Sequence, residues 1–467
     1  MSVDTTSQLD AAGLVQGLRE TFGTGVTKSF EWRDAQLDAM ARMLTEGEDQ
    51  ITEALAKDLG RPRFEAWAGD VRIIVREIED IKKHYRGWAG EQRYKTPAFF
   101  RPGRSSVRFD PLGVVLVIAP WNYPVQLLMS PLAAVIAAGN AAVAKPSELA
   151  PATSAVLTRL AGEYLDTDAI RFVEGGIEES TALLEQRWDH IMYTGNGAVG
   201  RIVAQAAAKH LTPVTLELGG QSPTIVDKDA NIGLAIQRIT SGKWLNAGQT
   251  CIAPNHVFVH EDVEEKLVSG IADSLRKRYG KDPKKSADFG RIVNERHAAR
   301  IAGLLGAGGY DEIAYGGDTD VPGRYIAPTV LRGVKPDAAV MQEEIFGPLL
   351  PILTFSDLSE PIDAINAGDK PLALYVFSKS SSTVERVLSE TSSGGVSVND
   401  CLMHVMNGEL PFGGVGESGY GAYHGRAGFE TFSHRKSVYR RPSFFRDPNL
   451  LRPPYSGWKN RIMRAIY

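Results

Sequence analysis

The sequence predicts an α/β fold made of two doubly wound, Rossmann-like α/β domains, with a small protruding β-hairpin as an oligomerisation element. The first observation is that short apolar runs alternate with helix-like runs from Gly113 to Glu217, and again after Glu217. Such alternation is typical of parallel sheets covered by helices. The second observation is length, because 467 residues exceed one ordinary hydrophobic core.

Composition restricts the classes of function. Hydrophobic residues make up 43% and charged residues 23% of the chain, which is typical of a globular protein in water. A net charge of −4 gives no general attraction to polyanions, so no nucleic-acid partner is expected. The two cysteines, Cys251 and Cys401, lie too far apart in the sequence to argue for a disulfide. They predict free thiols in a reducing, cytoplasmic compartment.

No targeting segment or transmembrane segment is expected. The first ten residues, MSVDTTSQLD, lack the apolar core of a signal peptide. The most apolar long run, residues 127–144, is interrupted by Pro131 and Gly139, which favours a buried helix followed by a strand. The C-terminal NRIMRAIY is basic and apolar, and a packed or frayed tail is the favoured interpretation. A weak contact with a membrane surface is the alternative.

The N-terminal part is expected to be helical. Residues 1 to about 12 are polar and predict disorder. Residues 30–88 predict helices, most clearly over 71–88, where apolar residues recur three and four positions apart. The segment 92–113 is broken by Pro and Gly and predicts an extended hairpin that leaves the globule and forms a dimer contact.

The two alternating regions then follow. In the first, strands are predicted at 114–120, 140–147, 171–176 and 189–194, with helices at 125–139, 152–165, 178–187 and 198–211. In the second, strands are predicted at 222–227, 254–259, 325–331 and 350–355, with helices at 234–248 and 263–280. Ligands bind beyond the carboxyl ends of parallel strands. The segments KPSE (145–148), VEGG (173–176) and YTGNG (193–197) should therefore line one crevice.

The stretch YTGNGAVG has the spacing of a dinucleotide-binding fingerprint. Gly195, Gly197 and Gly200 stand between a predicted strand and a predicted helix. Glu217 follows roughly twenty residues later, where such folds place an acid that binds the ribose. Taken alone, the stretch predicts a dinucleotide and assigns Glu217 to its ribose.

Four short motifs contain residues suited to chemistry, and each has two interpretations. Cys251 in GQTCIAP is a structural cysteine or a nucleophile. Glu217 in TLELGG is a paired strand-end acid or a catalytic carboxyl group. Asn122 in APWNYP makes turn bonds or donates to an oxyanion. In EEIFGP, Glu344 and Phe346 are a surface acid beside a core ring, or a pair that holds a ribose and a flat ring.

Taken together and in order, these motifs resemble the aldehyde dehydrogenase superfamily. The set is PWNYP, KPSE, YTGNGAVG, LELGG, GQTC, EEIFGP and PFGGVGESGYG. The segments AAAKHLTPVTLELGGQSP and AYHGRAGFETFSH are most similar to the class 3 and fatty-aldehyde branch, and the resemblance covers nearly the whole chain. It implies a dinucleotide-binding domain over 1–90 and 111–217 and a catalytic domain over 218–430. The hairpin and the C-terminal segment are then 91–110 and 431–467.

The resemblance also implies roles for single residues. Cys251 would be the nucleophile that forms a thiohemiacetal, Asn122 the oxyanion donor, and Glu217 the base for thioester hydrolysis. The fingerprint spacing then becomes accidental, since the resemblance needs Gly195 and Gly200 but not Gly197. The implied cofactor-binding set is Lys145, Glu148, Gly195, Gly200, Glu344, Phe346 and Trp121, and no metal is implied.

The implied cofactor is NAD, with NADP also accepted. Glu148 should repel a 2′-phosphate, and Lys145 beside it softens that preference. One departure from the family pattern is Gln221, which stands where LELGG is usually followed by Lys. We expect this change to alter a local contact and not the mechanism.

The substrate is expected to be a medium- or long-chain aliphatic aldehyde or an aromatic aldehyde. Tyr123, Gln126 and Leu127 and the loop 402–406 would line its tunnel, and they are largely apolar. Cys401 is either an apolar liner or a second reactive thiol. A homodimer is expected by analogy.

Three other functions are open to the same residues. Cys251 and Glu217 could serve a thiol hydrolase that cleaves esters. Acyl transfer to coenzyme A could replace hydrolysis, although Glu217 favours water. A structural protein that retains the fold is the third, and the presence of Cys251 argues against it.

Overall fold

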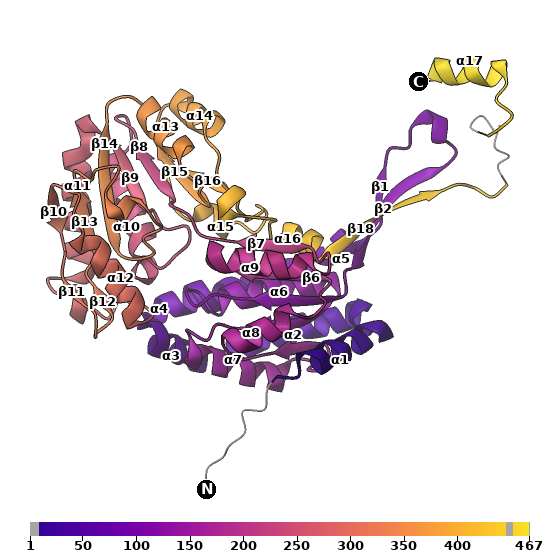
Figure 1. The fold of residues 1–467 in the computed structure, drawn as a ribbon, viewed down its shortest axis with the longest axis horizontal. Helices are drawn as coiled ribbons and strands as arrows, with labels where there is room; N and C mark the ends of the chain where they lie inside the picture. The colour runs from indigo at the N-terminus through magenta and orange to yellow at the C-terminus, as the bar shows by residue number, and fades with distance from the viewer. Residues whose placement is uncertain (1–8, 445–451, 467) are drawn as a thin grey trace, which may run out of the picture.

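The computed structural model describes residues 9–444 and 452–466, and it contains two parallel sheets and a separate three-stranded sheet (Figure 1). The first sheet has the strand order β17-β7-β6-β3-β4-β5. All of its pairs are parallel except β17 with β7. Its strands are β3 (Val114–Ile118), β4 (Ala141–Lys145), β5 (Ile170–Phe172), β6 (His190–Thr194), β7 (Val214–Glu217) and β17 (Gly419–Tyr420).

The second sheet has the strand order β10-β13-β14-β9-β8-β15-β16 and is parallel except at the β10 edge. Its strands are β8 (Pro223–Val226), β9 (His256–His260), β10 (Glu312–Tyr315), β13 (Thr329–Arg332), β14 (Leu349–Phe355), β15 (Ala373–Phe377) and β16 (Gly395–Val398). A small pair, β11 (Thr319–Asp320) and β12 (Tyr325–Ile326), lies beside it. The predicted α/β fold with two doubly wound sheets is confirmed.

The predicted hairpin is a projecting arm, which Figure 1 shows extending from the first domain. Strands β1 (Gln92–Tyr94) and β2 (Arg104–Pro111) form the hairpin. A third strand, β18 (Ser433–Arg440), pairs antiparallel with β2 along its whole length, from Ser433 opposite Pro111 to Arg440 opposite Arg104. The distant segments 91–110 and 431–440 therefore form one sheet.

Helices flank the sheets on both faces. The bounds in the first part of the chain are α1 (Ala11–Thr24), α2 (Phe30–Glu46), α3 (Glu48–Leu59), α4 (Arg63–Ala66), a π-helical segment (Trp67–Arg72), α5 (Ile73–Ala89), α6 (Gln126–Ala138), α7 (Pro151–Tyr164), α8 (Ile177–Leu184) and α9 (Gly197–Ala208). Those in the second part are α10 (Ile232–Trp244), α11 (Glu264–Tyr279), α12 (Glu295–Gly306), α13 (Ser359–Ala367), α14 (Ser381–Glu390), α15 (Met403–Met406), α16 (Gly425–Thr431) and α17 (Gly457–Ile466).

Strand β3 explains how the first sheet is buried on both sides. Val114 and Leu116 point into an apolar cluster shared with α1, α8 and α9, whereas Val115 and Val117 point into the cluster under α6. This alternation follows from the two-residue period of a strand. The cluster under α6 continues into the second sheet, so one continuous core runs through both domains.

Several boundaries differ from those predicted. Helix α1 begins at Ala11, where the Asp10 side chain accepts from the backbone of Gly13, so the predicted disorder to about residue 12 is wrong for its last positions. The first eight residues lie outside the described part of the chain. The predicted domain limits stay a prediction, but two contacts favour an end of the second domain before Gly419. Strand β17 pairs with β7, and α16 packs against α5 and α6.

The apolar run 127–144 forms the buried helix α6 followed by strand β4, as predicted. In the described part of the chain, no helix combines the length and the apolar character that a membrane crossing needs. The C-terminal tail includes α17, whose Trp458 is exposed, while Tyr467 lies outside the described residues. Its weak contact with a membrane surface stays a prediction.

Candidate active site

The two sheets meet through loops at opposite ends of their strands. In the first sheet the candidate residues follow the carboxyl ends: Asn122 lies beyond β3, and Lys145 and Glu217 are the last residues of β4 and β7. In the second sheet they precede the amino ends: Cys251 lies just before β9, and Glu344 lies just before β14. A hydrogen bond from Asn122 Nδ2 to the Gln249 carbonyl, 3.0 Å long, joins the two sets.

The turn before Cys251 has an unusual backbone. It is called the nucleophile turn below (residues 246–251), after the predicted role of Cys251. Asn246, Ala247 and Gly248 have φ values of 51°, 52° and 77°, in the left-handed region that L side chains rarely adopt. A side chain at Gly248 would collide with the Gly347 carbonyl. The turn therefore requires glycine at this position, and it ends α10 so that Cys251 projects from a loop.

Gln249 holds the nucleophile turn from inside the protein, and the sequence analysis did not identify it. Its side chain is fully buried. Nε2 donates to the carbonyls of Asn246 and Arg291, at 3.0 and 2.9 Å, and Oε1 accepts from the Val293 amide at 2.9 Å. A buried amide with every such bond made is a strong structural restraint. The only available signal was a Gln within a glycine-bounded motif.

Cys251 is a free thiol and is partly exposed. Burial raises its pKa to about 12, with further contributions from the negative charges of Glu344 and Glu217. Backbone hydrogen bonds at Cys251 and Ile252 oppose this rise. Burial is thus the main reason that the thiol stays protonated, and the charges of two carboxylates from different domains add to this effect.

Glu217 ends β7 as a buried carboxyl group. Both of its side-chain oxygens are buried without a hydrogen-bond partner. Burial alone raises its pKa well above the usual value. Its backbone is fixed on both sides, opposite Thr194 of β6 and Gly419 of β17. An unpaired carboxyl group in a rigid strand is costly to bury, which favours a chemical role over a structural one.

Glu344 lies against the segment that links the two sheets. A side chain at Gly219 would collide with the Glu344 carboxylate, and the Gly220 backbone hydrogen bonds to it. Burial raises the Glu344 pKa to about 8, against the opposing effects of that hydrogen bond and of the charges on Arg300 and Lys243. Glu344 therefore changes between its protonated and its ionised form slightly above neutral pH.

The rest of EEIFGP is rigid. The Ile345 amide donates to Asn255 Oδ1 at 2.9 Å, and the Ile345 carbonyl accepts from Arg300 Nη2 at 2.6 Å. Phe346 has a φ of 46°, and its ring meets Trp121 edge-on with centroids 5.3 Å apart. Two predicted cofactor-binding residues, Trp121 and Phe346, are thus brought together across the domains.

The predicted adenosine side lies at the carboxyl ends of β4 and β6. Lys145 is buried, and its Nζ donates to the Gly175 carbonyl at 2.8 Å and to Glu148 at 3.2 Å. Glu148 itself is exposed. A Cβ at Gly195 would collide with the Tyr193 hydroxyl, so the backbone there has no room for a side chain.

The three glycines of the fingerprint differ in their need for glycine. A Cβ at Gly200 would lie 2.9 Å from Leu218 Cδ2, closer than real contacts allow. A Cβ at Gly197 would meet only the flexible end of Arg201, at 3.3 Å. This difference supports the interpretation that the spacing is accidental at Gly197. The amino terminus of α9 is capped by a side chain, because Asn196 Oδ1 accepts from the Val199 amide at 3.0 Å.

The predicted substrate residues are placed unequally. The Tyr123 hydroxyl lies 2.9 Å from Thr250 Oγ1, next to Cys251. Gln126 and Leu127 begin α6, and the Gln126 amide donates to Asp70. In the loop 402–406, Met403 and Met406 are exposed. The roles of these residues in binding substrate stay predictions.

Two residues noted in the sequence have local explanations. Cys401 is buried against Gly242 of α10, and burial raises its thiol pKa, which favours a packing role. Gln221 donates from Nε2 to the Met341 carbonyl at 2.9 Å. This contact ties the linking segment to the region before EEIFGP, in agreement with a local effect of that substitution.

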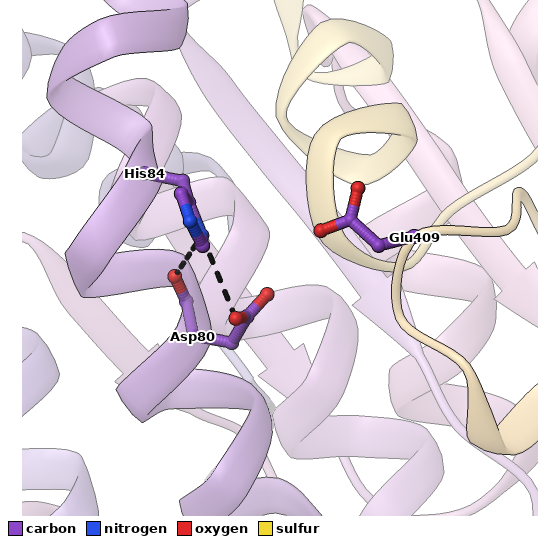
Figure 2. A group of neighbouring side chains, drawn as sticks. All are labelled: Asp80, His84 and Glu409. Carbon is purple, nitrogen blue, oxygen red and sulfur yellow. Dashed lines mark hydrogen bonds and ion pairs between the residues drawn. The ribbon is translucent and has the colours of Figure 1, made fainter.

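Among the described residues, three potential metal ligands come together at Asp80, His84 and Glu409 (Figure 2). His84 Nδ1 lies 3.0 Å from the Asp80 carbonyl within the same helix, and the His84 ring stacks on Trp88. Figure 2 shows Glu409 across a gap with no bond to either residue. His84 and Glu409 are exposed, and this group is explained as a surface contact between α5 and a loop.

The fold and the site define an α/β oxidoreductase. The aldehyde dehydrogenase family profile matches residues 2–438, and the chain belongs to the aldehyde dehydrogenase family. It is 47% identical to aldehyde dehydrogenase family 3 member A2 of Rattus norvegicus, over 95% of this chain and 92% of the relative. It is 46% identical to the relative named "Aldehyde dehydrogenase, dimeric NADP-preferring" from Rattus norvegicus, over 91% of this chain and 93% of the relative.

A solved structure agrees with these matches. The substrate-bound state of Staphylococcus aureus AldH superposes with a TM-score of 0.94 at 43% identity, covering 97% of this chain and 98% of that one. The predicted family, its class 3 branch and its fold are confirmed. The chain is an enzyme that oxidises aldehydes.

Proposed function

We propose that this enzyme oxidises aldehydes to carboxylic acids through a thioester on Cys251, with NAD preferred and NADP accepted. One observation carries the proposal. The free thiol of Cys251 is coupled electrostatically to a buried, unpaired carboxyl group, Glu217, while the amide of Asn122 is fixed on the turn that presents the thiol. Nucleophile, base and oxyanion donor therefore come from three segments that share one location.

The first step is addition of the Cys251 sulfur to the aldehyde carbon. The partly exposed thiol must first lose its proton to solvent, and the thiolate then attacks. The carbonyl becomes an alkoxide in a tetrahedral thiohemiacetal. One N–H of the Asn122 amide is bonded to Gln249, and the other is free for this oxyanion together with the Cys251 backbone N–H.

The second step converts the thiohemiacetal to a thioester. NAD(P)⁺, when bound, supplies the acceptor for the hydride. The carbonyl reforms as the hydride leaves the carbon, and the acyl group stays on Cys251. Glu344, Phe346 and Trp121 would hold the nicotinamide half, since Glu344 and Phe346 lie on the segment before β14 and the Trp121 ring packs against Phe346.

The third step is hydrolysis. Glu217 takes a proton from water, the hydroxide oxygen attacks the thioester carbon, and the thiolate of Cys251 is released with the carboxylic acid. A raised pKa makes Glu217 a stronger base than an exposed glutamate, which suits this role at neutral pH.

The residues at β4 and β6 fit an adenosine. The exposed Glu148 carboxylate, oriented by the buried Lys145, can accept hydrogen bonds from a ribose diol. Its charge disfavours a 2′-phosphate, and the ammonium of Lys145 reduces that effect. The relative named NADP-preferring supports acceptance of both cofactors.

The remaining proposals concern substrate, assembly and location. Tyr123 beside Thr250 and the exposed methionines of α15 support medium- or long-chain aliphatic or aromatic aldehydes. A relative named dimeric and the projecting arm of β1, β2 and β18 support a homodimer. The free thiols of Cys251 and Cys401 support a reducing, cytoplasmic location.

The proposal is tested by replacing Cys251 with alanine. We expect Cys251→Ala to lose NAD reduction with every aldehyde while the Kd for NAD, measured by calorimetry, stays within about threefold. Cys401→Ala is the matched control and should keep its activity. NAD reduction by Cys251→Ala would overturn the proposal. Turnover of ester substrates that does not change with NAD, in the absence of aldehyde oxidation, would favour the thiol hydrolase.

A further inference from the structure

The short connection between α3 and α5 contains a buried cation that contacts both domains. The Arg61 side chain is fully excluded from solvent. Its guanidinium forms an ion pair with Asp70, donates from Nη2 to the Asn122 carbonyl, and donates from Nε to Asn246 Oδ1 at 3.2 Å. Its centre also lies 4.5 Å from the centroid of the Tyr123 ring. Arg61 thus touches the segment of the proposed oxyanion donor and the first residue of the nucleophile turn.

The same connection holds Asn246 by a second contact. Glu65 Oε2 accepts from the Asn246 backbone amide at 3.0 Å. Asn246 in turn donates from Nδ2 to the Asn122 carbonyl at 2.9 Å and to the Gln249 carbonyl at 3.2 Å. The left-handed backbone at Asn246 is therefore held by partners on each side, as a strained position requires.

Asp70 extends the contact to the other side of Asn122. It lies in the π-helical segment and is fully buried, and Oδ1 accepts from the amides of Val125 and Gln126 at 3.2 and 3.0 Å. Those two amides open helix α6. The Arg61–Asp70 pair therefore fixes the chain at the carbonyl of Asn122 and again just beyond it.

Buried ions of this kind act as a unit. Burial raises the pKa of Asp70, and the positive charge of Arg61 opposes that rise. Removing the cation would leave a buried carboxylate without its counter-ion, which costs more than the pair contributes. Arginine suits the position because its planar fork serves three acceptors in different directions, whereas lysine provides one point charge.

We propose that Arg61, with Asp70, is a positioning residue that holds the amide of Asn122 in register with the nucleophile turn. Arg61 does not touch the substrate and acts through Asn122 and Asn246. The inference rests on the proposed function, in which Asn122 stabilises the oxyanion on the Cys251 adduct. It adds a requirement for a residue that none of the family motifs in the sequence contains.

The test compares four proteins: wild type, Arg61→Lys, Asn122→Ala and the double variant. We expect Arg61→Lys to lower kcat about tenfold or more, because a misplaced donor no longer stabilises the oxyanion of the transition state. The KM for aldehyde and the Kd for NAD should stay within about threefold. In the Asn122→Ala background, Arg61→Lys should lower kcat by less than about threefold, since its target is already gone.

A matched control separates positioning from stability. Arg33 is another buried arginine, and its guanidinium donates to the carbonyls of Thr27, Lys28 and Ala137, away from the site. Arg33→Lys should lower Tm and leave kcat unchanged. If Arg61→Lys does not fold, Asn246→Asp tests the same route, because Asp tolerates a left-handed backbone but cannot donate to the Asn122 carbonyl. It should lower kcat less than Arg61→Lys, and again only where Asn122 is present.

Three results would overturn the inference: equal losses of kcat from Arg61→Lys with and without Asn122, a loss of Tm with no change in kcat, or a rise in KM alone. A different result tests the proposed function. If Asn122→Ala keeps the wild-type kcat, the oxyanion role of Asn122 is wrong. Any slowing by Arg61→Lys would then show that it does not act through Asn122.

Discussion

The two parallel sheets contribute to the same site from opposite ends. The first sheet follows the usual rule, since Asn122, Lys145 and Glu217 lie at or beyond the carboxyl ends of β3, β4 and β7. The second sheet reverses the rule, since Cys251 and Glu344 precede the amino ends of β9 and β14. A strand end therefore does not by itself tell which edge of a sheet carries the chemistry. What decides it here is which edge faces the other domain.

The two sheets therefore carry different groups of the proposed site. The first sheet supplies the proposed base on the last residue of β7 and the proposed oxyanion donor in the loop after β3. The second supplies the proposed nucleophile and a carboxylate on irregular loops, with left-handed backbone at Asn246, Ala247 and Phe346. The predictions below test this division, from the largest effect to the smallest.

Replacement of the proposed base on the first sheet should separate the two halves of the reaction. We expect Glu217→Gln to lower steady-state kcat by about 10²–10⁴-fold, the usual contribution of a positioned base. A single-turnover burst of NADH, followed by stopped-flow absorbance, should remain at up to one equivalent per Cys251. Glu79→Gln, a change on the exposed face of α5, is the control. Loss of the burst together with kcat would show that Glu217 is needed for the first step as well.

Replacement of the second sheet's carboxylate should change the thiol. Glu344 has a pKa near 8, and its negative charge raises the pKa of Cys251. At pH 9.5 Glu344 is ionised, so Glu344→Gln should speed alkylation of Cys251 by about tenfold, the effect of one pKa unit. At pH 6.5 Glu344 is protonated in the wild type, and the two rates should agree.

Mass spectrometry of iodoacetamide-treated protein without cofactor gives these rates, and the buried Cys401 serves as an internal reference. Glu343→Gln is the matched control, because the neighbouring Glu343 pairs with Arg300. A pH-independent difference between Glu344→Gln and wild type would mean that the loop moved, and would contradict an effect of charge.

Cofactor choice tests the carboxyl end of β4 with a smaller effect. Glu148→Gln keeps a hydrogen-bonding group and removes the charge that opposes a 2′-phosphate. We expect the ratio of kcat/KM for NADP to that for NAD to rise about three- to tenfold, since one partly solvated charge contributes about 1 kcal/mol at this range. Glu163→Gln, an exposed change on α7, should leave the ratio unchanged. An unchanged ratio in Glu148→Gln would remove Glu148 from the cofactor site.

The smallest effect is expected within the glycine fingerprint. Gly197→Ala should change kcat/KM for NAD by less than about twofold, because its new methyl group meets only a flexible arginine. Gly200→Ala should weaken NAD binding or lower Tm measurably, since Leu218 has little room to move. Differential scanning fluorimetry with and without NAD distinguishes the two results. A large effect at Gly197 would restore the fingerprint as a functional motif.

The sequence predicts much of the first sheet and less of the second. Regular alternation identified β3, β4 and β6 and their helices, because buried parallel strands are continuous apolar runs. The strands β15 and β16 were not predicted, although ALYVF is as apolar as the others. The third strand of the arm, β18, was not predicted as a strand either. Its polar sequence, SHRKSVYR, lacks the alternation of a buried strand, and only pairing with β2 makes it one.

The site shows the same limit. Cys251, Glu217 and Asn122 were singled out by their local motifs, but their roles came from resemblance, and the structure adds their convergence. Arg61 and Gln249 were missed because nothing in their local sequence distinguishes them. Their importance arises from partners far along the chain, such as Asn246 for Arg61 and Val293 for Gln249. Such long-range contacts cannot be read from spacing.

The segment from Glu217 to Pro223 joins the last central strand of one sheet to the first strand of the other. The proposed base therefore stands on the covalent bridge between the two halves, while the nucleophile lies beyond it. Neither half could be exchanged for that of another protein, cut away, or expressed alone with a complete set of catalytic groups. The complete site thus requires both halves of the chain, even though the fold looks like two modules.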